Sequence, residues 1–224
     1  MTTTETIKDI RKRCRLAMNG VASTGMRESG LNYKLNFGVS LLKIKEIASV
    51  YSPDKELAEA LWQENVRELK ILATMLYPVI DFTKDKAGIW VCQIPNQEIR
   101  EQICLNLFQK LSYANEIATD WTTSPDNSTR ATGYWLLVRL MQAKLFTAKD
   151  NTDVIPLAFE DVLSADNVSL RNAALLALKY SGRKSKDDAD NILSRLKYLE
   201  KSSDALEKEV FDSLKFEFDY YFEQ

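Results

Sequence analysis

The chain has 224 residues, 45% of them hydrophobic, which suits one large domain or one short repeat array with a continuous core. Its 30 Lys and Arg are balanced by 32 Asp and Glu, so the formal net charge is −2, and a strongly basic module for nonspecific DNA binding is excluded unless the cations gather on one face. Histidine is absent, which removes the commonest general base and the commonest metal ligand.

Composition also sets expectations for compartment and ligands. No window holds enough consecutive apolar residues to span a membrane, and the polar N-terminus lacks the apolar run of a secretory signal, so we expect a cytoplasmic protein. The three cysteines, Cys14, Cys92 and Cys104, are far apart and odd in number, which predicts reduced thiols. We expect no metal, no cofactor and a monomer.

The first predicted helix lies near the N-terminus. Apolar residues recur there at steps of three and four, at Ile7, Ile10, Cys14, Ala17 and Val21. The same segment carries five cations that can follow a phosphate backbone or simply form a solvated helix face: Lys8, Arg11, Lys12, Arg13 and Arg15.

Prolines and caps divide the rest of the chain. The run Ser52-Pro53-Asp54 predicts a capping hydroxyl before a proline in the first turn of a helix. The apolar run from Ile89 to Ile94 alternates like a strand, but its helical surroundings favour the end of a helix. All five prolines stand where periodic segments begin or end, at Pro53, Pro78, Pro95, Pro125 and Pro156.

Five segments share one plan, a polar break followed by a basic residue that opens an apolar helix. They are Asn65 to Met75, Asn96 to Leu107, Asp126 to Leu137, Asp166 to Leu178, and Ser203 to Leu214. Their basic residues, separated by 33, 30, 41 and 37 positions, are Arg67, Arg100, Arg130, Arg171 and Lys208. This spacing is typical of HEAT or armadillo hairpins.

We therefore predict an all-α, right-handed superhelical solenoid of HEAT-like helical hairpins in a single domain, residues 1–224. Residues 1–52 would form N-terminal helices, 53–182 the central repeats and 183–224 the C-terminal capping helices, starting with Asp204 and Glu207 at capping-box spacing for the last helix. The acidic, aromatic end from Phe216 to Gln224 would cover the apolar face of the final repeat.

Stacked hairpins align their second helices, so the recurring basic residues can form a row along one curved surface, where helix N-termini add positive dipole ends. Such a row suits a phosphate backbone. The alternative is that these residues brace neighbouring repeats.

Several runs in the first part of the chain stand out: Asn19-Gly20-Val21, the run from Met26 to Tyr33 that contains Asn32, and Asn36-Phe37-Gly38-Val39-Ser40. These runs resemble the AlkD-like DNA alkylation repair family of HEAT-like-repeat DNA glycosylases, and the resemblance extends from about Met18 to Lys179. Its most specific pieces are Gly38-Val39 and the run from Arg67 to Thr74.

The resemblance implies a groove for duplex DNA and excision of cationic N3- or N7-alkylated purines, with a carboxylate that stabilises the oxocarbenium-like sugar. The family's catalytic aspartate falls on Glu101, its two cleft tryptophans fall on Gln97 and near Leu176, and its phosphate-gripping arginine falls on Arg130. The chain therefore keeps the arginine, lengthens the acid and loses both aromatics.

Three functions remain open at this point. The first is binding of duplex DNA, alkylated or not, by Arg67, Gln97, Arg100, Arg130 and Arg171, with Glu101 as the candidate catalytic residue. The second is a non-catalytic HEAT-repeat scaffold for proteins. The third, a hydrolase that uses Cys104, has no histidine to activate the thiol. Tryptophans Trp90 and Trp121 are either replacement aromatics or core residues.

Overall fold

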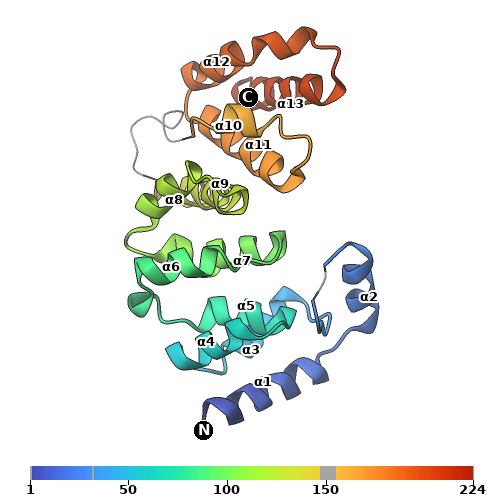
Figure 1. Cartoon of the computed structure of the whole chain (residues 1–224), viewed down its shortest axis with the longest axis vertical. Helices are drawn as coiled ribbons and strands as arrows, with labels where there is room; N and C mark the ends of the chain where they lie inside the picture. The colour runs from blue at the N-terminus through green and yellow to red at the C-terminus, as the bar shows by residue number, and fades with distance from the viewer. Residues whose placement is uncertain (1, 32, 147–154, 224) are drawn as a thin grey trace. The chain divides into compact units, whose positions relative to one another are not determined.

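The computed structural model describes residues 2–31, 33–146 and 155–223. Every regular element in these ranges is a helix, and the pairing of Leu35 with Val66 is an isolated bridge outside any strand (Figure 1). The α-helices are α1 (Thr3–Leu16), α2 (Gly20–Glu28), α3 (Leu41–Ala48), α4 (Lys55–Gln63), α5 (Arg67–Leu76), α6 (Lys84–Val91), α7 (Gln97–Asn106), α8 (Ala114–Thr122), α9 (Asn127–Gln142), α10 (Ala158–Asp161), α11 (Val168–Gly182), α12 (Lys186–Arg195) and α13 (Ala205–Phe222). The 3-10 helices are η1 (Val79–Asp81), η2 (Phe108–Lys110) and η3 (Lys197–Lys201). Asn32, which belongs to one of the runs that carry the family resemblance, lies outside the described residues.

The chain divides into two compact units. The first unit comprises Met1–Ala87 and Pro95–Leu111, and the second comprises Gly88–Ile94 and Ser112–Gln224. The division predicted from the sequence, one domain with parts at 1–52, 53–182 and 183–224, stays a prediction.

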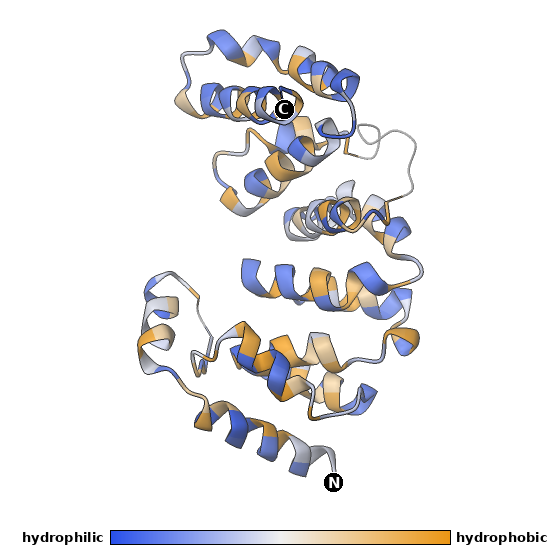
Figure 2. Cartoon of the chain, turned by 180° about the vertical axis from the view of Figure 1, so that it is seen from behind, coloured by the Kyte–Doolittle hydropathy of each residue, from blue (hydrophilic) through white to orange (hydrophobic). Residues whose placement is uncertain are grey.

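The first unit has the two layers of a HEAT array. Helix α1 packs on α4 in one layer, and α3, α5 and α7 pack in succession in the other. Helices α4 and α5, which form one hairpin, are rich in hydrophobic residues (Figure 2). Leu61, Leu69 and Leu72 of this hairpin are fully buried, so the periodic apolar residues do form the core.

The second unit repeats the arrangement. Helix α8 packs on α9, α9 packs on α11, and α11 packs on both α12 and α13. Gly133 allows α9 to pack closely on α8, because a Cβ atom there would lie 2.6 Å from the backbone nitrogen of Thr122 in α8. The predicted all-α class with HEAT-like helical hairpins is confirmed in both units.

Capping residues begin the second helices of the hairpins. Asn96, Asp126 and Asn167 each accept a hydrogen bond from the backbone N–H three residues further on. Asp204 accepts from the N–H groups two and three residues further on. These side chains satisfy N–H groups that have no partner within the helix. The four prolines that the sequence placed at helix boundaries after Pro53 also lie outside α-helices.

Three local predictions are corrected. The cap of α4 is Asp54, whose carboxylate accepts from the N–H of Leu57, so Ser52 is not the capping residue and Pro53 lies before the helix. The first helix ends at Leu16, because Asn19 turns the chain by donating its N–H to Phe37 and then caps α2. Val21, predicted on the buried stripe, is 86% exposed.

The third correction concerns the C-terminal cap. The residues of α13 that bury themselves are Val210, Phe211, Leu214 and Phe218, and the ring of Phe218 lies against Gly182 of α11. Within the predicted covering segment from Phe216 to Gln224, Phe218 therefore covers α11 as expected, whereas Phe216 is 73% exposed. The run from Ile89 to Ile94 is a helix end as predicted, because α6 continues to Val91.

Candidate nucleic-acid interface

A buried network of hydrogen bonds joins the glycine turn before α3 to the start of α5. Glu68 is fully buried, and its carboxylate accepts the backbone N–H groups of Phe37 at 3.1 Å and Val39 at 3.2 Å. Gly38 between them has φ +69°, and a Cβ atom there would lie 2.2 Å from the carbonyl oxygen of Asn19. Only glycine fits both the backbone angle and the space.

Arg67 completes this hydrogen-bond network. Its guanidinium is 2% exposed and donates to the carbonyl of Val39 at 2.7 Å, to Glu68 at 3.1 Å and to Glu98 at 2.7 Å. Burial opposes the charge on Arg67, but the hydrogen bonds and charges of Glu98 and Glu68 outweigh it and raise its pKa. Arg67 therefore links two repeats through buried contacts, and its predicted DNA contact stays a prediction.

The recurring basic residue occupies one helical register. Arg100, Arg130, Arg171 and Lys208 each stand four residues after the cap of their helix. In α5, whose first residue follows Val66, that register position is Lys70 and not Arg67. The sequence carried the signal, because Lys70, Arg100 and Arg130 are each 30 residues apart.

Several basic residues at this helical position contact a backbone carbonyl near the end of the preceding helix of the same hairpin. The Lys70 ammonium donates to the carbonyl of Trp62 at 2.6 Å, Arg130 donates to Ser124 at 2.6 Å, and Arg171 approaches Ser164 at 3.5 Å. These carbonyls lie at or just after the end of the preceding helix, where backbone acceptors lack helical partners. The contacts favour the bracing role over a row of phosphate contacts.

Around the candidate acid, α7 brings three predicted site residues together. The amide nitrogen of Gln97 donates to the carboxylate of Glu101 at 3.0 Å, and Arg100 donates to the amide oxygen of Gln97 at 2.6 Å. Arg100 is 5% exposed, whereas Gln97 and Glu101 are half-buried. The first turns of α7 therefore hold one polar chain in which Glu101 is half-buried and Arg100 is buried. The predicted phosphate contact of Arg100 and the predicted catalytic role of Glu101 stay predictions.

Arg130 belongs to the second unit and is saturated by partners. Its guanidinium pairs with Asp161 at 2.6 and 2.8 Å, and Tyr134 donates its hydroxyl to the same carboxylate at 2.7 Å. The hydrogen bond that Arg130 donates to Asp161 is the main reason why the pKa of Arg130 is raised. Sequence reasoning missed Asp161, which lies 31 residues after Arg130, the same interval that separates Arg67 from Glu98.

Other candidate residues fall in the core. Trp90 and Trp121 are 2% and 9% exposed, so they are core residues and not cleft aromatics. Cys104 is fully buried, which leaves the hydrolase hypothesis without a reachable thiol. Leu176 is half-buried on α11 and packs against the core of the second unit.

The cations of α1 are the contrasting case. Lys8, Lys12 and Arg15 follow one another at steps of four and three, all are exposed, and their side chains have no hydrogen bond or ion pair within the described residues. This stripe, the α1 stripe, lies on the face opposite the buried Ile10 and Cys14. The α1 stripe is therefore open to a charged partner.

Comparison with protein families decides the relationship. A family model described as "DNA alkylation repair enzyme" matches residues 15–191. The chain belongs to the DNA alkylation repair enzyme family. No protein of curated function matches the sequence.

A solved structure resembles this family member over nearly its whole length. It covers 95% of this chain and 94% of its own, with a TM-score of 0.76 and 13% sequence identity. It is described as belonging to "a new family of proteins related to the HEAT-like repeat DNA glycosylases with affinity for branched DNA structures". At this identity the likeness establishes the HEAT-like fold, which confirms the predicted solenoid class.

Residues that carry the family resemblance meet in this buried hydrogen-bond network. The two most specific runs, Gly38-Val39 and the one that starts at Arg67, meet at Glu68 in hydrogen bonds that fix the fold. These residues determine how the repeats join.

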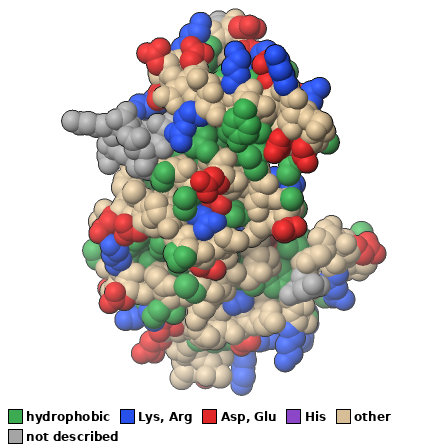
Figure 3. Space-filling model, turned by 45° about the horizontal axis from the view of Figure 1, so that its top comes forward, with side chains coloured by type: hydrophobic (Ala, Val, Ile, Leu, Met, Phe, Trp, Pro, Cys, Tyr) green, Lys and Arg blue, Asp and Glu red, His purple; other side chains and the backbone are tan. Residues whose placement is uncertain are grey.

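Charge is distributed unevenly along this family member. The first 52 residues hold nine of the 30 Lys and Arg but only four of the 32 Asp and Glu, a net charge of +5, so the remainder carries −7. Over the C-terminal helices, basic and acidic side chains are interspersed (Figure 3). The cations are thus concentrated at the N-terminal end of the chain, in the region that includes the α1 stripe.

Two further findings concern the described ranges only. None of their helices combines the length and apolar character that a membrane span requires. Their Cys, Asp and Glu side chains form no cluster of three or more that could hold a metal ion.

Proposed function

We propose that this member of the DNA alkylation repair family binds duplex DNA through phosphate contacts made by the α1 stripe. The observation that carries the proposal is the contrast between cations. Arg67, Arg100 and Arg130 are buried or saturated by acids, whereas Lys8 and its neighbours on the stripe are exposed and unpaired among the described residues.

The stripe has the dimensions of a short backbone contact. From Lys8 to Arg15 the helix rises about 10 Å, while phosphates of one DNA strand follow one another about every 3.4 Å along the axis. Three cations over that length match about three phosphates. The surrounding excess of positive charge supports the approach of DNA to this end of the chain.

The experiment is a salt titration of duplex affinity by fluorescence anisotropy. Neutralising the stripe with Lys8→Gln, Lys12→Gln and Arg15→Gln should weaken binding and reduce the slope of log K against log salt by about 2.7. A matched control neutralises three exposed lysines of the net acidic C-terminal region, Lys197, Lys201 and Lys208, and should leave the slope unchanged. Equal slopes for the stripe variant and wild type would refute the proposal, and absence of salt-dependent binding in wild type would favour the protein scaffold.

Base excision at Glu101 is not part of the proposed activity. Its carboxylate is engaged by Gln97, and Gln97 and Leu176 stand where the family resemblance places the aromatic side chains of the cleft. Without aromatic faces, a cationic sugar or base loses about 1–2 kcal/mol per cation-π contact. Release of 7-methylguanine or 3-methyladenine from methylated duplex tests this point, since release by wild type that Glu101→Gln abolishes would show that excision is retained.

The similar structure's described affinity for branched DNA suggests which form of duplex to test first. We propose that a branched duplex binds at least as tightly as a linear one of equal length, because two arms offer the stripe more phosphates within reach. Competition between a three-way junction and the linear duplex measures this preference.

A further inference from the structure

A cavity of about 370 Å³ lies within the second unit, where the ends of α9, α11 and α13 meet. Its volume falls in the range of small-molecule sites, about 300–1,000 Å³. The chemistry of its lining is mixed, with aromatic rings and cations together: Met141, Lys144, Phe146, Tyr180, Arg183, Lys184 and Tyr221.

One wall of the cavity is a preorganised aromatic stack. The guanidinium of Arg183 lies over the ring of Tyr180 at 4.3 Å and over that of Tyr221 at 5.5 Å. The Tyr180 hydroxyl accepts a hydrogen bond from Gln142 at 2.7 Å, which ties the ring to the end of α9. These contacts hold the ring of Tyr180 in place before any ligand arrives.

The acid nearest to this wall is already neutralised. Glu217 accepts from the Nε of Arg183 at 2.9 Å and pairs with Lys179 at 3.6 Å. Lys184, which follows Arg183 in the chain, and Lys144, on the other side of the cavity, add positive charge, so the surroundings of the cavity favour an anion.

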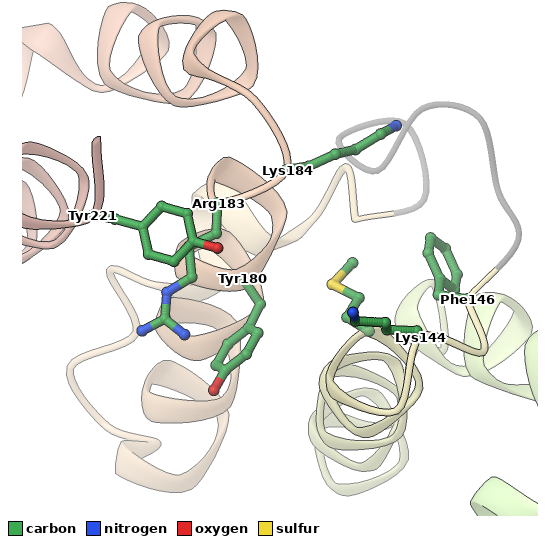
Figure 4. Close-up of a pocket in the computed structure, with 7 residues that line it drawn as sticks. Lys144, Phe146, Tyr180, Arg183, Lys184 and Tyr221 are labelled. Carbon is green, nitrogen blue, oxygen red and sulfur yellow. The ribbon is translucent and has the colours of Figure 1, made fainter. Parts of the chain in front are cut away.

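The opposite wall comes from the end of α9, where Lys144 and Phe146 lie across from Tyr180 (Figure 4). Lys144 has φ +57°, and the N–H of Leu145 bonds the carbonyl of Leu140 at 2.8 Å, so Lys144 occupies the left-handed position of a Schellman cap. Glycine is the usual residue there, because a side chain costs backbone strain. A lysine at a position where glycine is more stable, with its side chain lining a cavity, indicates a role outside folding.

We infer that this cavity binds an unpaired nucleotide of DNA, with the base against Tyr180 and Phe146 and its phosphate at Lys144. Stacking on aromatic rings beside cations is the general mode of single-strand recognition, and it needs no particular base. The inference rests on the proposed DNA binding, but it concerns a different site that shares no residue with the α1 stripe. It assigns to the second unit the recognition of single-stranded ends or arms.

The test uses the full chain and a short, labelled oligothymidylate, with affinity read by anisotropy. Tyr180→Leu should weaken binding at least about fivefold. Tyr180→Phe, which keeps the ring but loses the hydrogen bond from Gln142, should weaken binding less. Lys144→Gly should reduce the single-strand salt slope by about 0.7. Lys144→Arg keeps the charge and the strained backbone, so it should bind like wild type.

Thermal unfolding separates this role from a structural one. Lys144→Gly removes the backbone strain and should raise the melting temperature by about 2–4 °C while it weakens binding. A merely structural lysine would not combine gained stability with lost affinity. The control Lys197→Gln, at an exposed lysine outside the cavity, should change neither measurement.

Failure of this inference is distinguishable from failure of the proposed function. If wild type binds duplex but not the oligothymidylate, or if Tyr180→Leu and Lys144→Gly bind it as wild type does, the nucleotide site is refuted and the α1 proposal stands. If the oligothymidylate binds as expected but neutralising the α1 stripe leaves duplex binding unchanged, the α1 proposal is refuted and the nucleotide site stands. Binding to neither nucleic acid refutes both.

Discussion

Replacing Arg67 with methionine tests whether the recurring arginines serve the fold or the ligand. Methionine keeps much of the length of the side chain but removes every donor to Glu68, Glu98 and the carbonyl of Val39. Glu68 is fully buried and would keep only two backbone N–H partners, from Phe37 and Val39. The variant therefore leaves a carboxylate without its cation in the interior of the first unit.

Removing one partner of a buried ion pair costs about 3–5 kcal/mol, because the remaining charge is both desolvated and unpaired. For a chain of this size each kcal/mol lowers the melting temperature by about 2–4 °C, so we expect a loss of about 6–20 °C. Unfolding followed by far-UV circular dichroism measures it. At a temperature where the variant is folded, the salt slope of duplex binding should equal that of wild type.

A phosphate contact at Arg67 predicts the opposite pattern. Stability would then stay within about 0.5 kcal/mol of wild type, as for an ordinary surface substitution, and the salt slope would fall by about 0.9. The double variant Arg67→Met with Glu98→Gln serves as a control. Its loss should be smaller than the sum of the two single losses, since the residues interact directly.

Three further predictions follow from local contacts. Tyr51 donates its hydroxyl to Asp9 at 2.5 Å and, together with Arg13, lowers the pKa of that carboxyl; Tyr51→Phe should raise this pKa toward its ordinary value in an NMR titration. A depressed carboxyl pKa stabilises the fold above the unfolded pKa of about 4 and loses that effect as pH falls through the folded value, so the variant should be less stable than wild type at neutral pH and equal to it in acid. Gly133→Ala would force a methyl group against the backbone of α8 and should cost about 1–3 kcal/mol in urea unfolding. Burial raises the pKa of Cys14 to about 12 while Cys92 is exposed, so iodoacetamide at mildly alkaline pH should label Cys92 first in the native protein, and rapid labelling of Cys14 would show that its helix is not packed as described.

The helical periodicity of apolar residues, together with the positions of prolines and capping residues, predicted most of the fold. The five repeating segments correspond to α5, α7, α9, α11 and α13, and the prolines stand between helices. Local errors arose where two signals competed. At Ser52-Pro53-Asp54, both Ser and Asp are good caps, and the chain uses Asp54 because its side chain reaches the N–H of Leu57.

The candidate site was harder to predict, because exposure is not a local property. Arg67 and Arg130 look like free cations in the sequence, yet each meets an acid 31 residues further on, about one repeat away. Bracing was one of the two open alternatives, and only the packing of successive repeats favours it. The αL conformation of Lys144 has no sequence signal at all, since lysine is not a residue that marks this conformation.

The most direct test of where DNA lies is lysine footprinting by acetylation and mass spectrometry, with and without duplex DNA. We predict that DNA protects Lys8 and Lys12 of the α1 stripe, while Lys197 and Lys201, which are equally exposed, react at unchanged rates. Full reactivity of Lys8 and Lys12 in the presence of saturating DNA, together with protection elsewhere, would contradict the proposal that α1 makes the phosphate contacts.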